Sequence, residues 1–295
     1  MSNRNSQEAK RAARERLRAE REKQAKKEKV RRQAVVGGSI VAVLAVAAGI
    51  GVAVSKMGGP DGPWAAAAQV ADKGADGSMQ FDGKTVAYHA PAHTSGKKGL
   101  NVVVGDKNAK HTLTLYEDMR CPICSQFEQN VGETIQQDIK DGKYKVKFVF
   151  GTFLDGDTAD GLGSRGTGSK NALSALGAAL DVSPQAFVDY KYALFSKKNH
   201  PEETVDAFAK DKKLIDVAQQ VDALKDNKEF QKAVKDGRYD AWAMAMSAKF
   251  RAAKDVSGTP TVKLDGVHLK ADASGSPPMT PQQFNQLVDQ QMKKK

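Results

Sequence analysis

The sequence predicts an α/β domain with an inserted helical subdomain, preceded by a basic arm and one membrane-spanning helix. A strand pattern around Leu113, a helix pattern from Pro122 and a second strand pattern at Val146–Phe150 form a βαβ unit. A block of amphipathic helices follows at about residues 169–254, before a final hairpin and helix. An uncharged run at Ala34–Val54 precedes all of these elements.

The N-terminal arm, residues 1–33, is strongly basic. Residues 1–32 contain thirteen Lys and Arg and five Glu, a net charge of +8 out of +11 for the whole chain. The three lysines at Lys293–Lys295 account for the rest, so the remaining chain is nearly neutral. Basic patches interleaved with aromatic residues, typical of nucleic-acid binding, are absent after the arm, and we expect no nucleic-acid partner. The arm is expected either as a helix on the anionic inner leaflet or as a disordered chain.

Ala34–Val54 has twenty-one residues without a charge, and a helix of this length, at about 1.5 Å per residue, spans a bilayer core of about 30 Å. A cleaved signal peptide has a shorter apolar run of about 7–15 residues, and a soluble helix is seldom apolar on every face. We expect an uncleaved anchor, with cleavage near Ala65–Ala68 or a soluble helix as alternatives. The excess of Lys and Arg before the span predicts a cytoplasmic N-terminus, with everything after Lys56 extracytoplasmic.

A linker and a small hairpin are expected between the span and the main domain. Residues 55–78 are rich in Gly, Ala, Asp and Pro with little periodicity, which is typical of a tether. Residues 79–99 predict a β-hairpin with Asp82 and Gly83 in its turn, followed by a loop. The main domain would then occupy residues 100–295.

The helical block of the main domain shows a period close to 3.6, and its aromatic and methionine side chains are expected to fill a core. After it, Asp265 and Gly266 between two short apolar runs predict a hairpin, and Pro281–Met292 predicts a closing helix. The predicted helices of the block are Asn171–Leu180, Pro184–Ser196, Glu202–Lys210, Leu214–Asp226, Lys228–Asp236 and about Tyr239–Ala253.

The chain has two cysteines, Cys121 and Cys124, where the first strand ends and the helix begins. Two cysteines this close cannot link distant segments, so a reactive pair is favoured over a structural disulfide. Cys121 would occupy the N-cap position, where unpaired N–H groups and the helix dipole stabilise a thiolate. Pro122 suits the first helical turn, because its missing N–H needs no partner there. Cys124 could close a disulfide with Cys121 or resolve a mixed disulfide.

A zinc site would need two further ligands beside the cysteines, and an inert surface pair is the remaining alternative. Gly161–Gly166 satisfies G-x-G-x-x-G, but about ten residues separate it from the preceding strand, whereas a dinucleotide fingerprint begins at the strand's end. We therefore expect no metal and no organic cofactor. The five histidines, which offer no convincing pair of zinc ligands, are His89, His93, His111, His200 and His268.

Two segments resemble a known family. Val-Gly-Asp at residues 104–106 and Tyr-Glu-Asp-Met-Arg-Cys-Pro-Ile-Cys-Ser-Gln-Phe at 116–127 resemble the active-site segment of the DsbA-like, "thioredoxin 4" branch of the thioredoxin superfamily. Val-Ser-Gly-Thr-Pro-Thr at 256–261 resembles the loop that holds this family's cis-proline. The resemblance covers about residues 100–293, and it implies a thioredoxin fold with helices inserted between its halves.

The resemblance also implies roles for single residues. Cys121 would be the nucleophile and Cys124 the resolving thiol. Pro260 would form a cis peptide bond with Thr259 and lie beside the cysteines, and the backbone of Thr259 would pair with an extended substrate. The expected reaction is dithiol–disulfide exchange.

The implied function is that of an extracytoplasmic thiol–disulfide oxidoreductase, which we expect to act as an oxidant on exported proteins with thiols or disulfides. Pro122 and Ile123 are expected at the substrate-binding surface together with Thr259. Electrons must pass to a second redox protein, which the sequence does not identify. A reductase or isomerase, or a non-catalytic binding module, remains an alternative, because the fold does not fix the function.

Two positions depart from the family pattern. Many members have a buried Glu or Asp six residues before the first cysteine, where this chain has Leu115. Glu117 and Asp118 lie nearby and are expected as partners in salt bridges. Strongly oxidising relatives place His between the cysteines, where this chain has Ile123. We therefore expect a less depressed pKa for Cys121 and a milder oxidant.

Overall fold

The computed structural model describes residues 76–81, 84–155 and 166–294, all of them in one unit of the chain. The predicted basic arm, the predicted span and the linker up to residue 75 lie outside these ranges, so they stay predictions. Within the described ranges, no helix combines the length and the apolar character that crossing a membrane requires.

The first strands form a separate hairpin. β1 (Gly77–Phe81) and β2 (Lys84–Tyr88) are antiparallel, which confirms the predicted hairpin. β1 begins two residues earlier than predicted, inside the expected linker.

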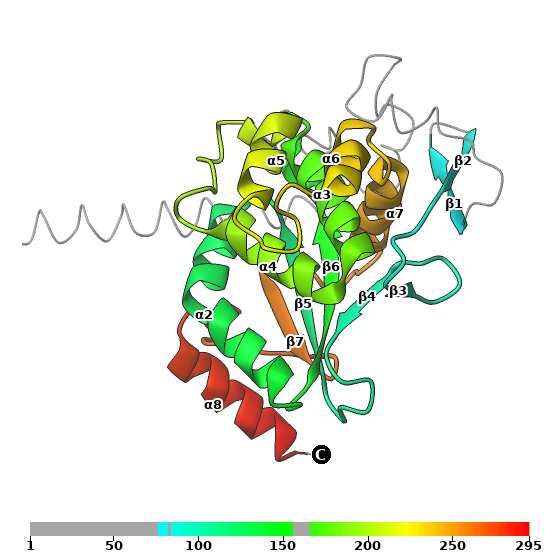
Figure 1. The fold of residues 1–295 in the computed structure, drawn as a ribbon. Coiled ribbons are helices and arrows are strands. Elements are labelled where there is room, and N and C mark those ends of the chain that lie inside the picture. Colours follow the sequence, from blue (N-terminus) through cyan, green and yellow to red (C-terminus); the bar gives the residue numbers. More distant parts are fainter. Residues whose placement is uncertain (1–75, 82–83, 156–165, 295) are drawn as a thin grey trace, which may run out of the picture. The chain divides into compact units, whose positions relative to one another are not determined.

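A six-stranded sheet forms the centre of the domain, in the order β3-β4-β6-β5-β7-β8 (Figure 1). β5 and β6 are parallel, and every other neighbouring pair is antiparallel. β5 is hydrogen-bonded to both β6 and β7, so the last part of the chain returns to the strand that precedes the cysteines. The strands are β3 (Thr94–Ser95), β4 (Asn101–Val104), β5 (Thr112–Asp118), β6 (Lys145–Gly151), β7 (Thr261–Leu264) and β8 (Val267–His268).

Helix α2 (Pro122–Lys140) connects β5 to β6 and completes the predicted βαβ unit. Its predicted apolar stripe is buried at Phe127, Val131 and Ile135. Ile123, at the start of the stripe, is 46% exposed and does not contribute to the core. The first turn of α2 therefore presents an apolar side chain to the solvent.

Helix α8 (Pro281–Met292) has the bounds that the sequence predicts. It lies alongside α2 (Figure 1), where the rings of Phe127 and Phe284 meet edge to face with centroids 6.5 Å apart. Phe284 and Val288 are fully buried. The pair α2–α8 thus covers part of the sheet with an aromatic core.

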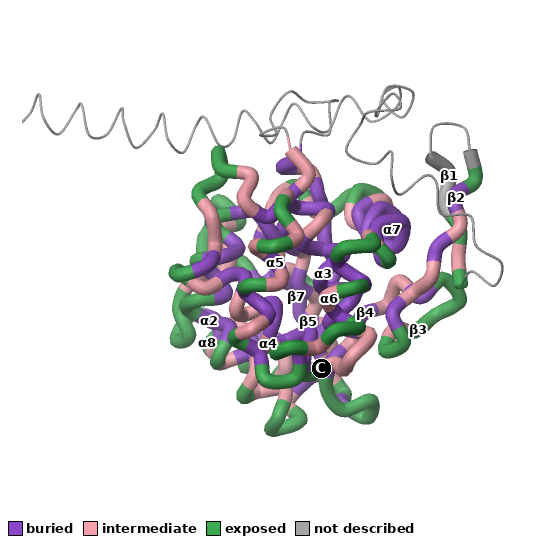
Figure 2. The backbone as a smooth tube through the Cα atoms, turned by 45° about the horizontal axis from the view of Figure 1, so that its top comes forward, coloured by how far each residue is buried: buried purple, intermediate pink, exposed green. Residues whose placement is uncertain are grey.

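The predicted helical insertion is present between β6 and β7. Most of the aromatic side chains that were expected to fill its core are fully buried, Trp242 and Tyr190 among them, whereas Phe250 is only partly buried. Figure 2 shows buried positions following one another along its last helix. Its elements are η3 (Phe153–Asp155), α3 (Gly168–Val182), α4 (Pro184–Phe195), η4 (Ala207–Ala209), α5 (Asp211–Ala218), α6 (Lys228–Lys235) and α7 (Asp240–Arg251).

One predicted helix of the insertion is wrong. Glu202–Lys210 contains only the single 3-10 turn η4. The reason is that its polar groups bind elsewhere: the carbonyl of Glu203 accepts a hydrogen bond from Arg120, and the carboxylate of Asp206 accepts two from the start of α3. Helix α5 is also shorter than predicted and ends at Ala218.

Candidate functional site

The two cysteines lie at the start of α2, immediately after β5. Cys121 is the N-cap residue in an extended conformation, and its Sγ accepts a hydrogen bond from the backbone N–H of Cys124 at 3.4 Å. Pro122 occupies the first helical turn, as predicted. Both cysteines are free thiols; Cys121 is 7% exposed and Cys124 is fully buried. Cys121 is therefore the sulfur that a partner can reach.

The loop before β7 brings the predicted proline to this site. The Thr259–Pro260 peptide bond is cis, and the Sγ of Cys121 lies 3.6 Å from the carbonyl oxygen of Thr259, to which it donates. The register explains the meeting, because Thr261 pairs with Tyr116 across β5 and β7. The sheet thus unites two segments that are far apart in the sequence.

The acidities of the two thiols differ strongly. The pKa of Cys121 is lowered to about 7, chiefly by the hydrogen bond from the Cys124 side chain, although burial acts in the opposite direction. The pKa of Cys124 is raised well above its usual value by burial and by the charges of Cys121 and Glu117. Near neutral pH the negative charge therefore resides on Cys121. A pKa near 7 is close to that of thioredoxin, about 7, and far above that of the strongest oxidants, about 3.5.

A buried cluster of ion pairs involves β5 and α2, the two elements at whose junction the cysteines lie. The ammonium of Lys191, on α4, lies 3.2 Å from the carboxylate of Glu117 and 2.5 Å from that of Glu128. Burial, together with the charge of Glu128, raises the pKa of Glu117 to about 7 against the opposing charge of Lys191. The charge of Glu117 in turn raises the pKa of Cys124. The buried cluster therefore influences the acidity of Cys124 through the charge of Glu117.

The predicted salt bridge is confirmed for Glu117 and is wrong for Asp118. Asp118 is held by hydrogen bonds from the Ser169 hydroxyl at 2.6 Å and from the backbone N–H of Arg120 at 2.9 Å. Although Glu117 was expected nearby, its effect on the acidity of Cys124 was not predicted. Leu115 and Glu117 are two residues apart on one strand and share a face, so Glu117 presents a carboxylate one step nearer the dithiol. Strand parity is the signal that could have found it.

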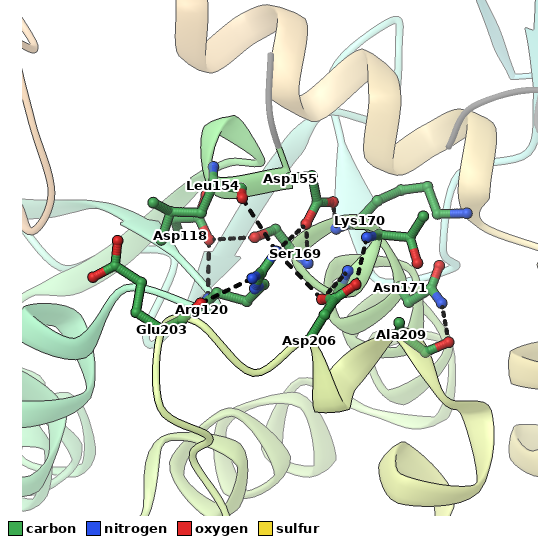
Figure 3. A network of polar contacts seen from close by, with 12 residues as sticks. Asp118, Arg120, Leu154, Asp155, Ser169, Lys170, Asn171, Glu203, Asp206 and Ala209 are labelled. Carbon is green, nitrogen blue, oxygen red and sulfur yellow. Dashed lines mark hydrogen bonds and ion pairs between the residues drawn. The ribbon is translucent and has the colours of Figure 1, made fainter. Parts of the chain in front are cut away.

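Pro122 and Ile123, the predicted substrate-facing residues, are both exposed beside Cys121. A further buried residue of this turn was missed by the sequence analysis: Arg120, which directly precedes the nucleophile, is 1% exposed and lies in a polar network with the insertion (Figure 3). In the ranges that the structure describes, no three His, Cys, Asp or Glu side chains are arranged to hold a metal ion.

Solved structures share this fold. MdbA of Actinomyces oris, named a thiol-disulfide oxidoreductase, is 21% identical over 68% of this chain and 88% of its own, with a TM-score of 0.52. BdbD of Bacillus subtilis is 19% identical over 69% of this chain and 98% of its own, with a TM-score of 0.51. Chlamydia trachomatis DsbA is 18% identical over 70% of this chain and 97% of its own, also with a TM-score of 0.51. A search of curated proteins gave no match.

These likenesses confirm the predicted thioredoxin-like fold with inserted helices. Residues 97–290, well over half of the chain, match the family model described as Thioredoxin, and the chain therefore belongs to the thioredoxin family.

Proposed function

We propose that this chain is an extracytoplasmic thiol–disulfide oxidoreductase that acts on exported proteins as a moderate oxidant. The observation that carries the proposal is the asymmetry of the dithiol. Cys121 is the more exposed sulfur and has a pKa lowered to about 7, whereas Cys124 is buried and has a raised pKa. One cysteine is thus suited to exchange with a partner and the other to resolve the product.

The oxidising reaction begins with a disulfide between Cys121 and Cys124. A substrate thiolate attacks the Sγ of Cys121, the bond to Cys124 breaks, and Cys124 leaves with the electron pair and takes up a proton. A second substrate thiolate attacks the substrate sulfur of this mixed disulfide, and Cys121 leaves as a thiolate. The substrate has then lost two electrons and two thiol protons; one proton is on Cys124, the other has passed to the solvent, and the reduced enzyme holds Cys121 as a thiolate. The lowered pKa of Cys121 makes it the better leaving group in the second step.

In this proposal, Glu117 donates the proton that Cys124 takes up. Glu117 is fully buried, its pKa is raised to about 7, and its charge raises the pKa of Cys124. A carboxyl group of this acidity can donate a proton when Cys124 leaves and accept one when Cys124 attacks. Lys191 remains as the counter-ion when Glu117 is ionised.

Two features support a moderate oxidising strength. Ile123 lies between the cysteines and supplies no charge to stabilise the thiolate. The pKa of Cys121, about 7, is only modestly lowered. We expect a reduction potential below that of the strongest oxidant, about −120 mV. A value near that of thioredoxin, about −270 mV, would favour a reductase of exported proteins.

The same proposal includes a membrane anchor at residues 34–54 with the basic arm in the cytoplasm. It is supported by the twenty-one uncharged residues and by the thirteen basic residues before them. A reporter enzyme active only outside the cytoplasm, fused after Lys295, should be active, and the full chain should remain in the membrane fraction. Activity of a cytoplasmic reporter at the same position would overturn the topology.

The chemistry is tested with the substitution Cys124→Ser and its matched control Cys121→Ser. With Cys124 replaced, the Cys121 thiolate should attack a disulfide of an unfolded, disulfide-bonded model protein and accumulate as a mixed disulfide, visible on non-reducing gels and reversed by dithiothreitol. With Cys121 replaced, no such species should form. If neither variant traps a partner, the chain is a binding module and not an enzyme of this class.

The direction is tested separately in growing cells. Acid quenching followed by alkylation with a mass-tagged maleimide reports whether Cys121 and Cys124 are oxidised or reduced. An oxidant should be mainly in the disulfide form. A mainly reduced pair would instead identify a reductase or isomerase.

A further inference from the structure

Arg120 connects the turn of the nucleophile to the helical insertion. It directly precedes Cys121, and its guanidinium is buried among oxygen atoms that belong to two other segments of the chain (Figure 3). Its partners are the Leu154 carbonyl at 3.1 Å, the Asp155 carboxylate at 3.1 Å, the Asp206 carboxylate at 3.3 Å and the Glu203 carbonyl at 2.9 Å.

The two carboxylates of this network also bind the start of α3. Thr167, the N-cap residue, provides no side-chain hydrogen bond. Instead, the backbone N–H groups of Thr167 and Gly168 donate to Asp206, and those of Ser169 and Lys170 donate to Asp155, all at 2.8–2.9 Å. Arg120 therefore provides the positive charge for the two carboxylates, Asp155 and Asp206, that cap the N-terminus of α3.

The turn itself is fixed from the other side. The carboxylate of Asp118 accepts from the N–H of Arg120, and the carbonyl of Asp118 accepts from the N–H of Cys121 at 3.0 Å. The hydroxyl of Ser169, on α3, donates to the same carboxylate. The backbone of the nucleophile and the start of the insertion thus belong to one hydrogen-bonded unit.

The segment after α4 follows the first turns of α2. The carbonyl of Phe195 accepts from the side chains of Ser125 at 2.7 Å and Gln129 at 3.0 Å. Further along, the guanidinium of Arg120 binds the carbonyl of Glu203. We call residues 202–206 the flanking segment. The flanking segment is thus hydrogen-bonded to the residue that directly precedes Cys121.

The flanking segment has an exposed apolar side chain. Val205 is 52% exposed, and in the described part of the chain the large hydrophobic side chains with comparable exposure are Ile123, at 46%, and Val267, at 48%. Two of these three, Ile123 and Val205, therefore lie on the elements that Arg120 joins. Exposed apolar groups on two elements that are joined through the residue before the nucleophile can contact the apolar side chains of a polypeptide.

We propose that Arg120 is a positioning residue that holds the flanking segment beside the dithiol, and that Val205 on this segment contacts the substrate. The substrate class is an extended, unfolded polypeptide with an apolar residue near its cysteine. A small thiol lacks the additional apolar residue that would contact Val205. This inference rests on the proposed function and adds a determinant of substrate choice to it.

The side chain of arginine is needed for this geometry. Its planar guanidinium binds the carboxylates through Nη1 and the Glu203 carbonyl through Nη2. Lysine keeps the positive charge between Asp155 and Asp206 but has no second donor arm. Arg120→Lys should therefore preserve the network charge and loosen the flanking segment.

The test measures the reduction of the oxidised enzyme by two substrates. One is a reduced, unfolded protein, and the other is glutathione. Arg120→Lys and Val205→Ser should each raise KM for the protein about five- to tenfold with kcat nearly unchanged, while the rate with glutathione changes less than about twofold. Val267→Ser is the matched control. Val267 pairs with Leu264, which pairs with Leu113 at the opposite end of β5 from the cysteines. This control should leave both reactions at the wild-type rate.

The outcomes separate this inference from the proposed function. Wild-type protein that reacts with neither substrate would overturn the proposed function. An active wild type whose KM for the protein is the same in Val205→Ser and Val267→Ser would overturn the role of the flanking segment. An Arg120→Lys variant that loses both reactions in equal measure would show a purely structural role for Arg120. Val205→Ser keeps the test valid if the arginine variant folds poorly, because its side chain is exposed.

Discussion

The ammonium of Lys191 lies 3.2 Å from the carboxylate of Glu117, so an inserted helix supplies the counter-ion for an acid that lies four residues before the nucleophile. The same ammonium lies 2.5 Å from Glu128 on α2. The ammonium of Lys191, on α4, therefore forms ion pairs with both β5 and α2. The helical insertion contributes to the electrostatics of the dithiol and not only to the shape of the domain.

Lys191→Met should destabilise the fold by about 3–5 kcal/mol, because it leaves two buried carboxylates without a counter-ion. The loss should be smaller at pH 5 than at pH 8, since protonation of Glu117, whose pKa is raised to about 7 by burial, relieves the repulsion. Urea unfolding at both pH values measures it. Lys212→Met is the control: this lysine is 84% exposed in its pair with Asp216, and its loss should cost under about 1 kcal/mol. Equal losses in the two variants would contradict the proposed cluster.

Glu117→Gln should flatten the pH dependence of stability between about pH 4.5 and 7. Burial raises the pKa of Glu117 from 4.5 to about 7, so in this range the folded chain keeps a proton that the unfolded chain has lost. The stabilising contribution is complete below pH 4.5 and is lost as the pH rises through 7. Glutamine cannot ionise and removes this part of the slope, whereas the raised pKa of Asp118 leaves another part in place.

The measurement is urea unfolding of wild type and variant at several pH values from 4 to 8. The exposed substitution Glu229→Gln should retain the wild-type slope. Glu117→Gln should also slow the resolution of the mixed disulfide by Cys124, because the group that accepts the proton of Cys124 is gone. A variant with the wild-type slope and the wild-type resolution rate would refute both roles of Glu117.

Local signals explain which parts of the fold the sequence could predict. Helix α8 has its predicted bounds because Thr280 caps its N-terminus and Pro281 occupies its first turn. The hydroxyl oxygen of Thr280 accepts a hydrogen bond from the backbone N–H of Gln283. Cys121 was placed correctly for the same reason, as an N-cap followed by proline. In both cases the determining contacts lie within four residues.

Contacts distant in the sequence explain the failures. The segment 202–210 has a helical pattern, yet its backbone is bound by Arg120, 83 residues away from Glu203. Nothing in the local pattern identifies that partner. Similarly, the expectation of a salt bridge at Glu117 could not name Lys191, which only the packing of α4 brings near. Tertiary contacts overrode helix propensity in the first case.

Gly142→Ala should cost about 1 kcal/mol of stability and leave the exchange chemistry unchanged. Gly142 ends α2 with a φ of +68°, a conformation that Cβ disfavours, and no atom lies within 4 Å of a Cβ built there. The cost is therefore conformational and not steric. Gly142→Asn is the matched variant and should lose less, because asparagine tolerates this conformation better. Urea unfolding would contradict the assignment if alanine proved as stable as glycine.

Alkylation of the reduced protein by iodoacetamide should reach half of its maximal rate near pH 7, through Cys121 alone. The hydrogen bond from Cys124 lowers the pKa of Cys121 to about 7, whereas Cys124 is buried with a pKa raised well above its usual value and should stay unmodified. Cys121→Ser should abolish the reaction at neutral pH. Because the folded pKa of Cys121 lies below the usual thiol value of about 8.5, its thiolate stabilises the reduced fold above that pH, and this contribution is lost as the pH falls through 7. A midpoint near 8.5 would show an ordinary thiol, and one near 3.5 would show the strong oxidant that Ile123 argues against.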